Sequence, residues 1–150
     1  MADVKSGLLS FLSEKVPKHI MDRFEERENQ VVVTELSAVL VALLTWREEL
    51  AGRDLVVLVD AEAVEAALVK GTSAAADLGH LIELVWKVAV EAKVAVYFDR
   101  VPTDANLSDG PSRGFLDELR RRGAVRCAAG GAVRGLGGTS RPRWGSPIPR

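Results

Sequence analysis

Apolar positions in the middle of the chain follow patterns that predict alternating strands and helices. The short β-branched run Gln30–Val33 is typical of a strand. A helix is expected to follow and to end at Gly52, which is suited to a helix stop. Its buried face is predicted from apolar residues at 3.6-residue spacing, namely Leu36, Val39, Leu40, Leu43 and Leu50.

Two continuous apolar runs, Leu55–Val59 and Val94–Phe98, have the pattern of central strands that are covered on both faces. Between them, Ala61–Lys70 predicts a short helix closed by Gly71, and Gly114–Arg122 predicts a last helix. A longer helix before the second run is predicted from the stripe Leu78, Leu81, Ile82, Val85 and Ala89. This order of strand, two helices, strand and helix implies an α/β fold with a mainly parallel sheet.

The two ends of the chain carry weaker patterns. Gly7–Leu12 predicts a strand, and Pro17 is suited to opening a short helix that reaches about Phe24. From Gly123 onward no apolar periodicity remains, and residues 123–150 are rich in Gly, Arg and Pro without a single acidic residue. We therefore expect a domain over residues 1–122 and a disordered basic tail over residues 123–150.

Composition limits the classes of protein to which the chain can belong. Its 150 residues fit one domain, and 47% are hydrophobic. The net charge of −1 leaves no overall basic field, so nucleic acid would have to be bound by local groups. Cys127 is the only cysteine, which excludes an internal disulfide and a cysteine-based zinc cluster. The longest apolar run, Leu36–Trp46, is too short to span a bilayer, and no signal-peptide pattern opens the chain. We expect a soluble intracellular protein without membrane contact, nuclear or cytoplasmic.

Three carboxylates occupy positions that favour chemistry. Glu35 falls in the predicted first turn of the long helix, Asp60 ends a predicted strand, and Asp109 lies in the loop before the last helix. If the two strands are neighbours, these groups converge on one edge of the sheet, where α/β proteins build their sites. Clustered carboxylates suit Mg²⁺, and a pair of such ions can drive phosphodiester cleavage.

Each of these residues also has a structural interpretation. Glu35 could serve the helix dipole, and Asp60 could cap the following helix. Asp109, before Gly110 and Pro111, could be an ordinary turn residue.

Three segments resemble the ribonuclease H domains of retrotransposon-type reverse transcriptases: VVVTELSAVLVALLTW, LVVLVDAEAVEAALVKG and VYFDRVPTDANLSDGPSRG. The resemblance runs from Ser6 to Gly123, and its most specific part is the N-x-x-D-x-x-S-R block. It implies that Glu35, Asp60 and Asp109 are catalytic Mg²⁺ ligands. It also implies that Asn106 and Arg113 contact nucleic acid.

The resemblance further implies a mixed sheet flanked by helices, and hydrolysis of RNA in RNA–DNA hybrids with two Mg²⁺ ions. Its implied partners are such a hybrid or another nucleic acid, and an adjoining reverse transcriptase domain. The family's first catalytic Asp lies on an earlier strand, and Asp3 has the wrong spacing for that role. Ala61 stands where relatives carry Asn, and Ser108 where they carry Ala. We therefore expect a domain that is truncated at its N-terminus, with the first strands missing or incomplete, and inactive unaided.

Two other interpretations stay open at this point. The chain could be a non-catalytic remnant that acts as a structural or nucleic-acid-binding module. It could also be an unrelated small α/β domain with an acidic pocket, although this leaves the N-x-x-D-x-x-S-R block unexplained. The arginines Arg113, Arg120, Arg121 and Arg122 suit either phosphate contacts or a solvated helix end.

Overall fold

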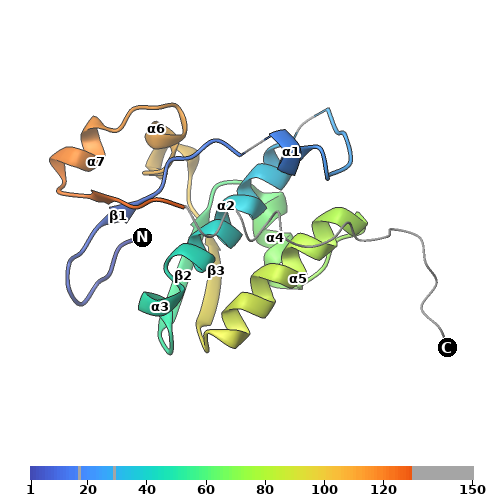
Figure 1. Ribbon diagram of the computed structural model, residues 1–150, viewed down its shortest axis with the longest axis horizontal. Coiled ribbons are helices and arrows are strands. Elements are labelled where there is room, and N and C mark those ends of the chain that lie inside the picture. The colour runs from blue at the N-terminus through green and yellow to red at the C-terminus, as the bar shows by residue number, and fades with distance from the viewer. Residues whose placement is uncertain (17, 29, 130–150) are drawn as a thin grey trace.

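The computed structural model describes residues 1–16, 18–28 and 30–129 (Figure 1). They form a mixed α/β structure with seven α-helices and four strands among the described residues. In chain order, the elements are β1 (Ser10–Phe11), α1 (Lys18–Met21), α2 (Val31–Thr45), α3 (Arg47–Leu50), β2 (Asp54–Val59), α4 (Glu62–Lys70), α5 (Ala76–Glu91), β3 (Ala95–Arg100), the 3₁₀ turn η1 (Thr103–Ala105), α6 (Asp109–Ser112), α7 (Asp117–Arg121) and β4 (Val125–Arg126).

Strands β2 and β3 are parallel neighbours, which confirms the pairing expected from the two apolar runs. Their register runs from Asp54 beside Ala95 to Val59 beside Arg100. Helices α4 and α5 form the crossover between them, as parallel strands require. Gly71 ends α4 in the left-handed conformation, with φ +74°, and its N–H donates to the carbonyl groups of Ala67 and Leu68.

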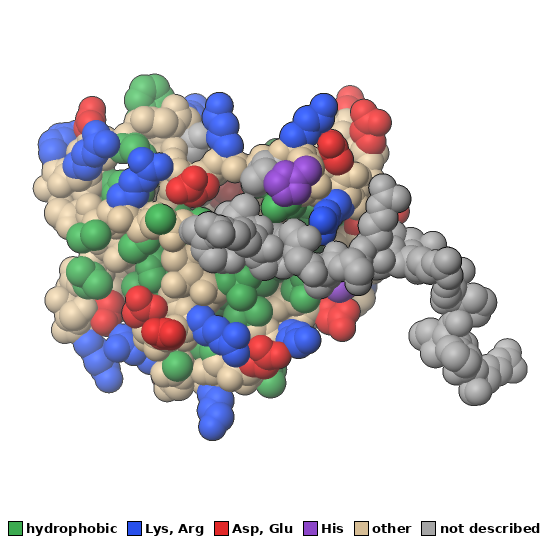
Figure 2. Space-filling model, in the orientation of Figure 1, with side chains coloured by type: hydrophobic (Ala, Val, Ile, Leu, Met, Phe, Trp, Pro, Cys, Tyr) green, Lys and Arg blue, Asp and Glu red, His purple; other side chains and the backbone are tan. Residues whose placement is uncertain are grey.

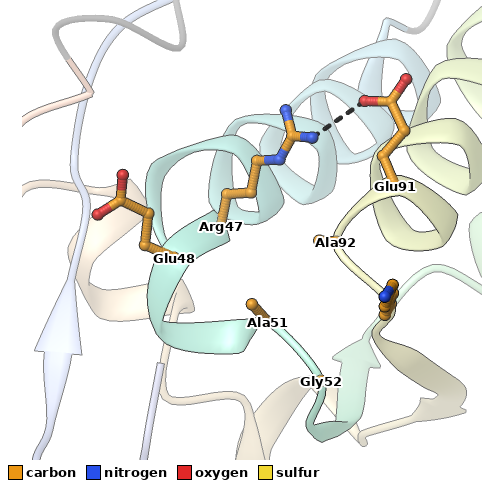
Figure 3. Close-up of a pocket in the computed structure, with 7 residues that line it drawn as sticks. Arg47, Glu48, Ala51, Gly52, Glu91 and Ala92 are labelled. Atoms are coloured by element: carbon orange, nitrogen blue, oxygen red, sulfur yellow. Dashed lines mark hydrogen bonds and ion pairs between the residues drawn. The ribbon is translucent and has the colours of Figure 1, made fainter.

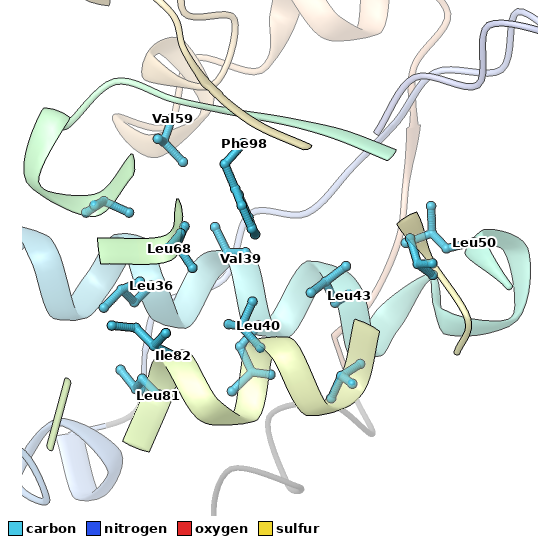
Figure 4. Packing of buried hydrophobic residues seen from close by; sticks show 14 of the residues in the cluster. Leu36, Val39, Leu40, Leu43, Leu50, Val59, Leu68, Leu81, Ile82 and Phe98 are labelled. Carbon is cyan, nitrogen blue, oxygen red and sulfur yellow. The ribbon is translucent and has the colours of Figure 1, made fainter. Parts of the chain in front are cut away.

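The hydrophobic core lies on one side of this sheet. Helix α2 lies between α5 and the sheet, as Figure 4 shows for Leu40, Ile82 and Phe98. Val33, Ile82 and Val85 are fully buried, and the Trp86 ring meets the Phe98 ring edge-on at a centroid distance of 5.5 Å. Burial of the large aliphatic side chains of three helices against one sheet face holds the fold together.

The other side of the sheet is open, which corrects the expectation that both faces would be covered. Leu55, Val57 and Val59 point into the core. Their neighbours Val56 and Leu58 are 61% and 56% exposed, and Tyr97 on β3 is 65% exposed. A continuous apolar run does not distinguish a strand buried on both faces from one with an apolar but open face. Whether the second face is covered depends on the elements that pack around the strand.

The segment predicted as a strand at Gln30–Val33 is helical instead, because α2 begins at Val31. Val33 is fully buried and extends the apolar face formed by Leu36 and Leu40. Burial of that face outweighs the β preference of three successive valines, since propensity is a weak prior against tertiary packing. The helix is also shorter than predicted, because it ends at Thr45 and a separate turn, α3, follows Trp46.

A second parallel pair joins β1, near the N-terminus, to β4, near the end of the described residues. The Val125 N–H donates to the Leu9 carbonyl, and the Cys127 N–H donates to the Phe11 carbonyl, each at 2.8 Å. The sequence pattern predicted only tail from residue 123, whereas Val125 and Arg126 form the strand β4. The rest of the predicted tail lies outside the described residues. No helix in the described ranges is long and apolar enough to cross a membrane.

Candidate functional site

The carboxyl groups of Glu35 and Asp60 meet at the end of β2. Asp60 directly follows the last residue of β2, and Glu35 projects from the second turn of α2 rather than from its first turn. The two carboxyl groups are close enough to affect each other's charge, and the backbone N–H of Ala61 lies near the Glu35 carboxyl group. One of the Glu35 oxygens, Oε2, is buried without a hydrogen-bond partner among the described residues.

This environment raises the pKa of Glu35 to about 7. Burial is the main cause, because it disfavours the charged carboxylate, and the neighbouring Asp60 adds repulsion and a hydrogen bond to the protonated form. The Ala61 N–H acts in the opposite direction. Glu35 therefore changes its protonation state near neutral pH.

The structure also decides against the capping interpretation of Asp60. The residue at the N-cap of α4 is Ala61, and no side chain caps this helix. Asp60 instead directs its carboxyl group to Glu35, which belongs to another element. The parallel β2–β3 edge thus carries the carboxyl groups of Asp60 and Glu35 at its carboxyl end.

Asp109 does not join this pair in one ligand group. It begins α6, and its Oδ1 accepts from Arg113 Nε at 3.1 Å. Among the described residues, no three His, Cys, Asp or Glu side chains form a group that could hold a metal ion. The spacing of residues after β3 could not predict the position of the Asp109 carboxylate, because that position depends on the conformation of the turn η1 and the helix α6.

Asn106 has a structural task in the same loop. Its Oδ1 accepts from the backbone N–H of Ser108 at 3.0 Å and from the Ser108 hydroxyl at 2.6 Å. The Asn106 carbonyl accepts the N–H of Asp109 at 3.1 Å. These bonds shape the entry to α6, and the Arg113 side chain, 65% exposed, reaches back to its first residue.

Sequence reasoning missed a buried ion pair between Arg27 and Asp77. The Asp77 side chain is 6% exposed and accepts from Arg27 at 2.6 and 2.8 Å. It also accepts the backbone N–H of Glu25 at 3.0 Å. These hydrogen bonds lower the pKa of Asp77, and Arg27 is the main cause. An aspartate in the first turn of a helix is common, so the position of Asp77 did not indicate that it pairs with a residue so far away in the sequence.

A surface hollow lies at the opposite end of the sheet from the carboxyl pair (Figure 3). It is lined by the turns that lead into β2 and β3, including Gly52 and Lys93. Across it, Arg47 and Glu91 form an exposed ion pair at 3.1 Å. The hollow is open and two of its charged groups, Arg47 and Glu91, pair with each other, so we assign no chemistry to it.

Comparison of the chain with protein-family profiles, with curated protein sequences and with solved structures finds no match.

Proposed function

We propose that the chain is a ribonuclease H-like domain of a retroelement reverse transcriptase, with an incomplete site that does not cleave RNA unaided. The observation that carries the proposal is the contact between Glu35 and Asp60 at the carboxyl end of β2. These are two of the three carboxylates for which the resemblance implies a catalytic role. The resemblance implies that a carboxylate from a helix and a carboxylate from the end of a strand lie together, and the contact between Glu35 and Asp60 supports this.

The donor set fits one hard cation. Glu35 can exchange its proton for Mg²⁺, which prefers oxygen ligands, and its Oε2 is buried without a hydrogen-bond partner among the described residues. Glu35 and Asp60 would hold the ion, and bound Mg²⁺ supplies water activation and charge stabilisation in phosphodiester hydrolysis. A second ion needs further carboxylates, and Asp109 is engaged by Arg113. The described residues therefore fit one ion and not two.

A cation titration tests the binding site. We expect Mn²⁺, used as a paramagnetic stand-in for Mg²⁺, to broaden the NMR signals of Glu35, Asp60 and Ala61 first. Asp60→Asn should abolish this selective broadening, whereas Asp54→Asn, at the other end of the same strand, should not. Broadening that is equal in the two variants would contradict the assignment of the site.

An activity assay tests the incomplete site. With Mg²⁺ the chain should leave an RNA–DNA hybrid uncut, because loss of ligands leaves the reacting groups misplaced, and a displacement of about 1 Å can cost roughly a hundredfold in rate. Fusion to an upstream β-hairpin carrying an Asp should restore cleavage, and Asp60→Asn in the fusion should abolish it. Cleavage by the unfused chain that depends on Asp60 would refute the proposed inactivity.

A second candidate is a non-catalytic remnant that binds nucleic acid or serves a structural role. The ion pair of Asp109 with Arg113 favours it, because the third carboxylate is then a structural partner rather than a free ligand. The hairpin fusion separates the two candidates, since a remnant stays inactive even when the missing Asp is supplied.

A further inference from the structure

Positive charge is concentrated in one part of the described chain, residues 107–127, which we call the arginine lobe. It contains helices α6 and α7 and strand β4. The lobe holds five arginines, no lysine and three acidic residues, so its net charge is +2. Residues 1–106 hold eleven basic and eighteen acidic residues, a net charge of −7. The lobe is therefore the place where the described chain would attract a polyanion.

The arginine side chains of the lobe are at the surface. Figure 2 shows basic side chains gathered at the upper left, where Figure 1 places α7. Arg120, Arg121 and Arg122 have side chains that are 63%, 75% and 53% exposed. Arg126, also exposed, donates to the backbone carbonyl of Ser13.

The acidic residues of the lobe hold these arginines in place without neutralising all of them. Glu118 alone accepts from Arg121 at 2.7 Å and from Arg122 at 2.8 Å, and Asp117 accepts from Arg120 at 3.4 Å. A guanidinium group has five N–H donors, so each of these ion pairs leaves donors available for phosphate oxygens. The ion pairs also restrict the arginine side chains before a ligand binds, so these side chains lose less conformational entropy on binding.

An aromatic ring is exposed within the same lobe. Phe115 is 71% exposed and immediately precedes the N-cap residue of α7. Its backbone is fixed, because its N–H donates to the Gly110 carbonyl at 2.8 Å after a turn at Gly114 with φ +87°. A bulky side chain at Gly110 would press on Phe115, whose carbonyl oxygen lies 3.4 Å from the Cβ position of that glycine. The ring is thus presented to solvent from a defined turn.

We propose that the arginine lobe binds single-stranded nucleic acid, with an unpaired base stacked on Phe115 and phosphates bound by the arginines. Recognition of unpaired bases uses exposed aromatic rings together with guanidinium groups, and the arginine lobe carries both within one short segment. A duplex hides the faces of its bases, so an exposed ring cannot stack on them there. The inference goes beyond the proposed function, because its ligand is a single strand and it does not involve Glu35 or Asp60.

Binding by the full chain can be measured by fluorescence anisotropy with a labelled fifteen-nucleotide oligouridylate at low salt. We expect this strand to bind more tightly than an RNA–DNA hybrid of the same length. Phe115→Ala should weaken binding about tenfold, within the roughly 5- to 150-fold range that removal of one base stack produces. Phe115→Trp should retain binding, and the quenching of its fluorescence should report the stacked base.

Tyr97→Ala provides the matched control, because Tyr97 is an aromatic residue of similar exposure on the open sheet face. It should leave the affinity unchanged. Arg120→Ala combined with Arg122→Ala should weaken binding and reduce its salt dependence. The logarithmic slope should fall by roughly 0.7 for each phosphate of the single strand that the variant no longer neutralises. The arginines beyond residue 129 are the same in every variant, so they cannot produce these differences.

Three results would overturn the proposal. The first is equal binding by Phe115→Ala and Tyr97→Ala, with circular dichroism showing that both variants are folded. The second is a preference for the hybrid that Phe115→Ala does not alter. The third is binding to anionic phosphatidylserine vesicles, but not to oligouridylate, in a Phe115-dependent manner, which would identify a membrane surface as the ligand of the lobe.

Discussion

Glu35 and Asp60 bring two carboxyl groups together at the end of the sheet, although one belongs to helix α2 and the other follows strand β2. Burial and a neighbouring carboxyl group both disfavour the charged form of Glu35, so the contact makes the stability of the fold sensitive to pH.

Stability should therefore decrease as the pH rises from 4.5 to about 7. The pKa of Glu35 is raised from 4.5 to about 7 in the folded chain, so between these values the folded state holds a proton that the unfolded state has lost. After allowance for solvent screening, we expect the free energy of unfolding to fall by about 1–2 kcal/mol. Denaturant unfolding across this pH range measures the change.

Glu35→Gln should remove this pH dependence, because a glutamine has no proton to lose. Asp60→Asn should reduce it, since the charge of Asp60 contributes to the raised pKa of Glu35. NMR titration of the Glu35 carboxyl carbon gives the pKa directly. Parallel stability curves for the unmodified chain and Glu35→Gln would contradict the assignment.

Arg27→Ala should destabilise the chain by about 2–4 kcal/mol, because it leaves the buried Asp77 carboxylate without its cation. The control is Arg47→Ala, which breaks an ion pair with both side chains over 40% exposed and should cost less than about 1 kcal/mol. Thermal and denaturant unfolding measure both. Similar losses for the two variants would mean that the burial of Asp77 contributes little.

The ion pair of Arg27 with Asp77 should also lose its stabilising effect in acid. Because the pKa of Asp77 is lowered in the folded chain, its stabilisation is complete above the unfolded value of 3.8 and is lost as the pH falls through the lower folded value. Arg27→Ala should reduce this loss, which unfolding measured below pH 4 can detect.

The open sheet face should make the chain prone to association, since Val56, Leu58 and Tyr97 present an apolar surface beside unpaired strand edges. Val56→Thr should lower aggregation, measured by light scattering, with little change in the free energy of unfolding. Val57→Thr, on the core side of the same strand, should cost about 1–3 kcal/mol. Equal costs at the two positions would show that the outer face is covered.

Val125→Pro should destabilise the β1–β4 pair, because proline has no N–H to donate to the Leu9 carbonyl. Val125→Thr keeps the N–H on a side chain that is 54% exposed, so it should be nearly neutral. The Cys127 amide, bonded to the Phe11 carbonyl, should exchange with solvent faster only in the proline variant. Unchanged exchange there would indicate that β4 contributes nothing to this end of the fold.

Local patterns were sufficient for the elements that carry strong periodicity. The apolar stripe of α5, the stop at Gly71 and the two apolar runs of β2 and β3 each report the conformation of nearby residues. Because two parallel strands need a crossover, their order also predicted the pairing and placed Asp60 at the carboxyl edge.

Only the tertiary structure decided the remaining features, because they depend on residues far apart in the sequence. Val31 is helical since its turn extends a face buried against α5 and the sheet, and the open side of Val56 reflects which elements are available to cover it. Asp77 pairs with Arg27 across a sequence separation of 50 residues, which no spacing rule encodes. The sequence determined which groups could form a carboxylate site, and the packing decided that only two of them meet.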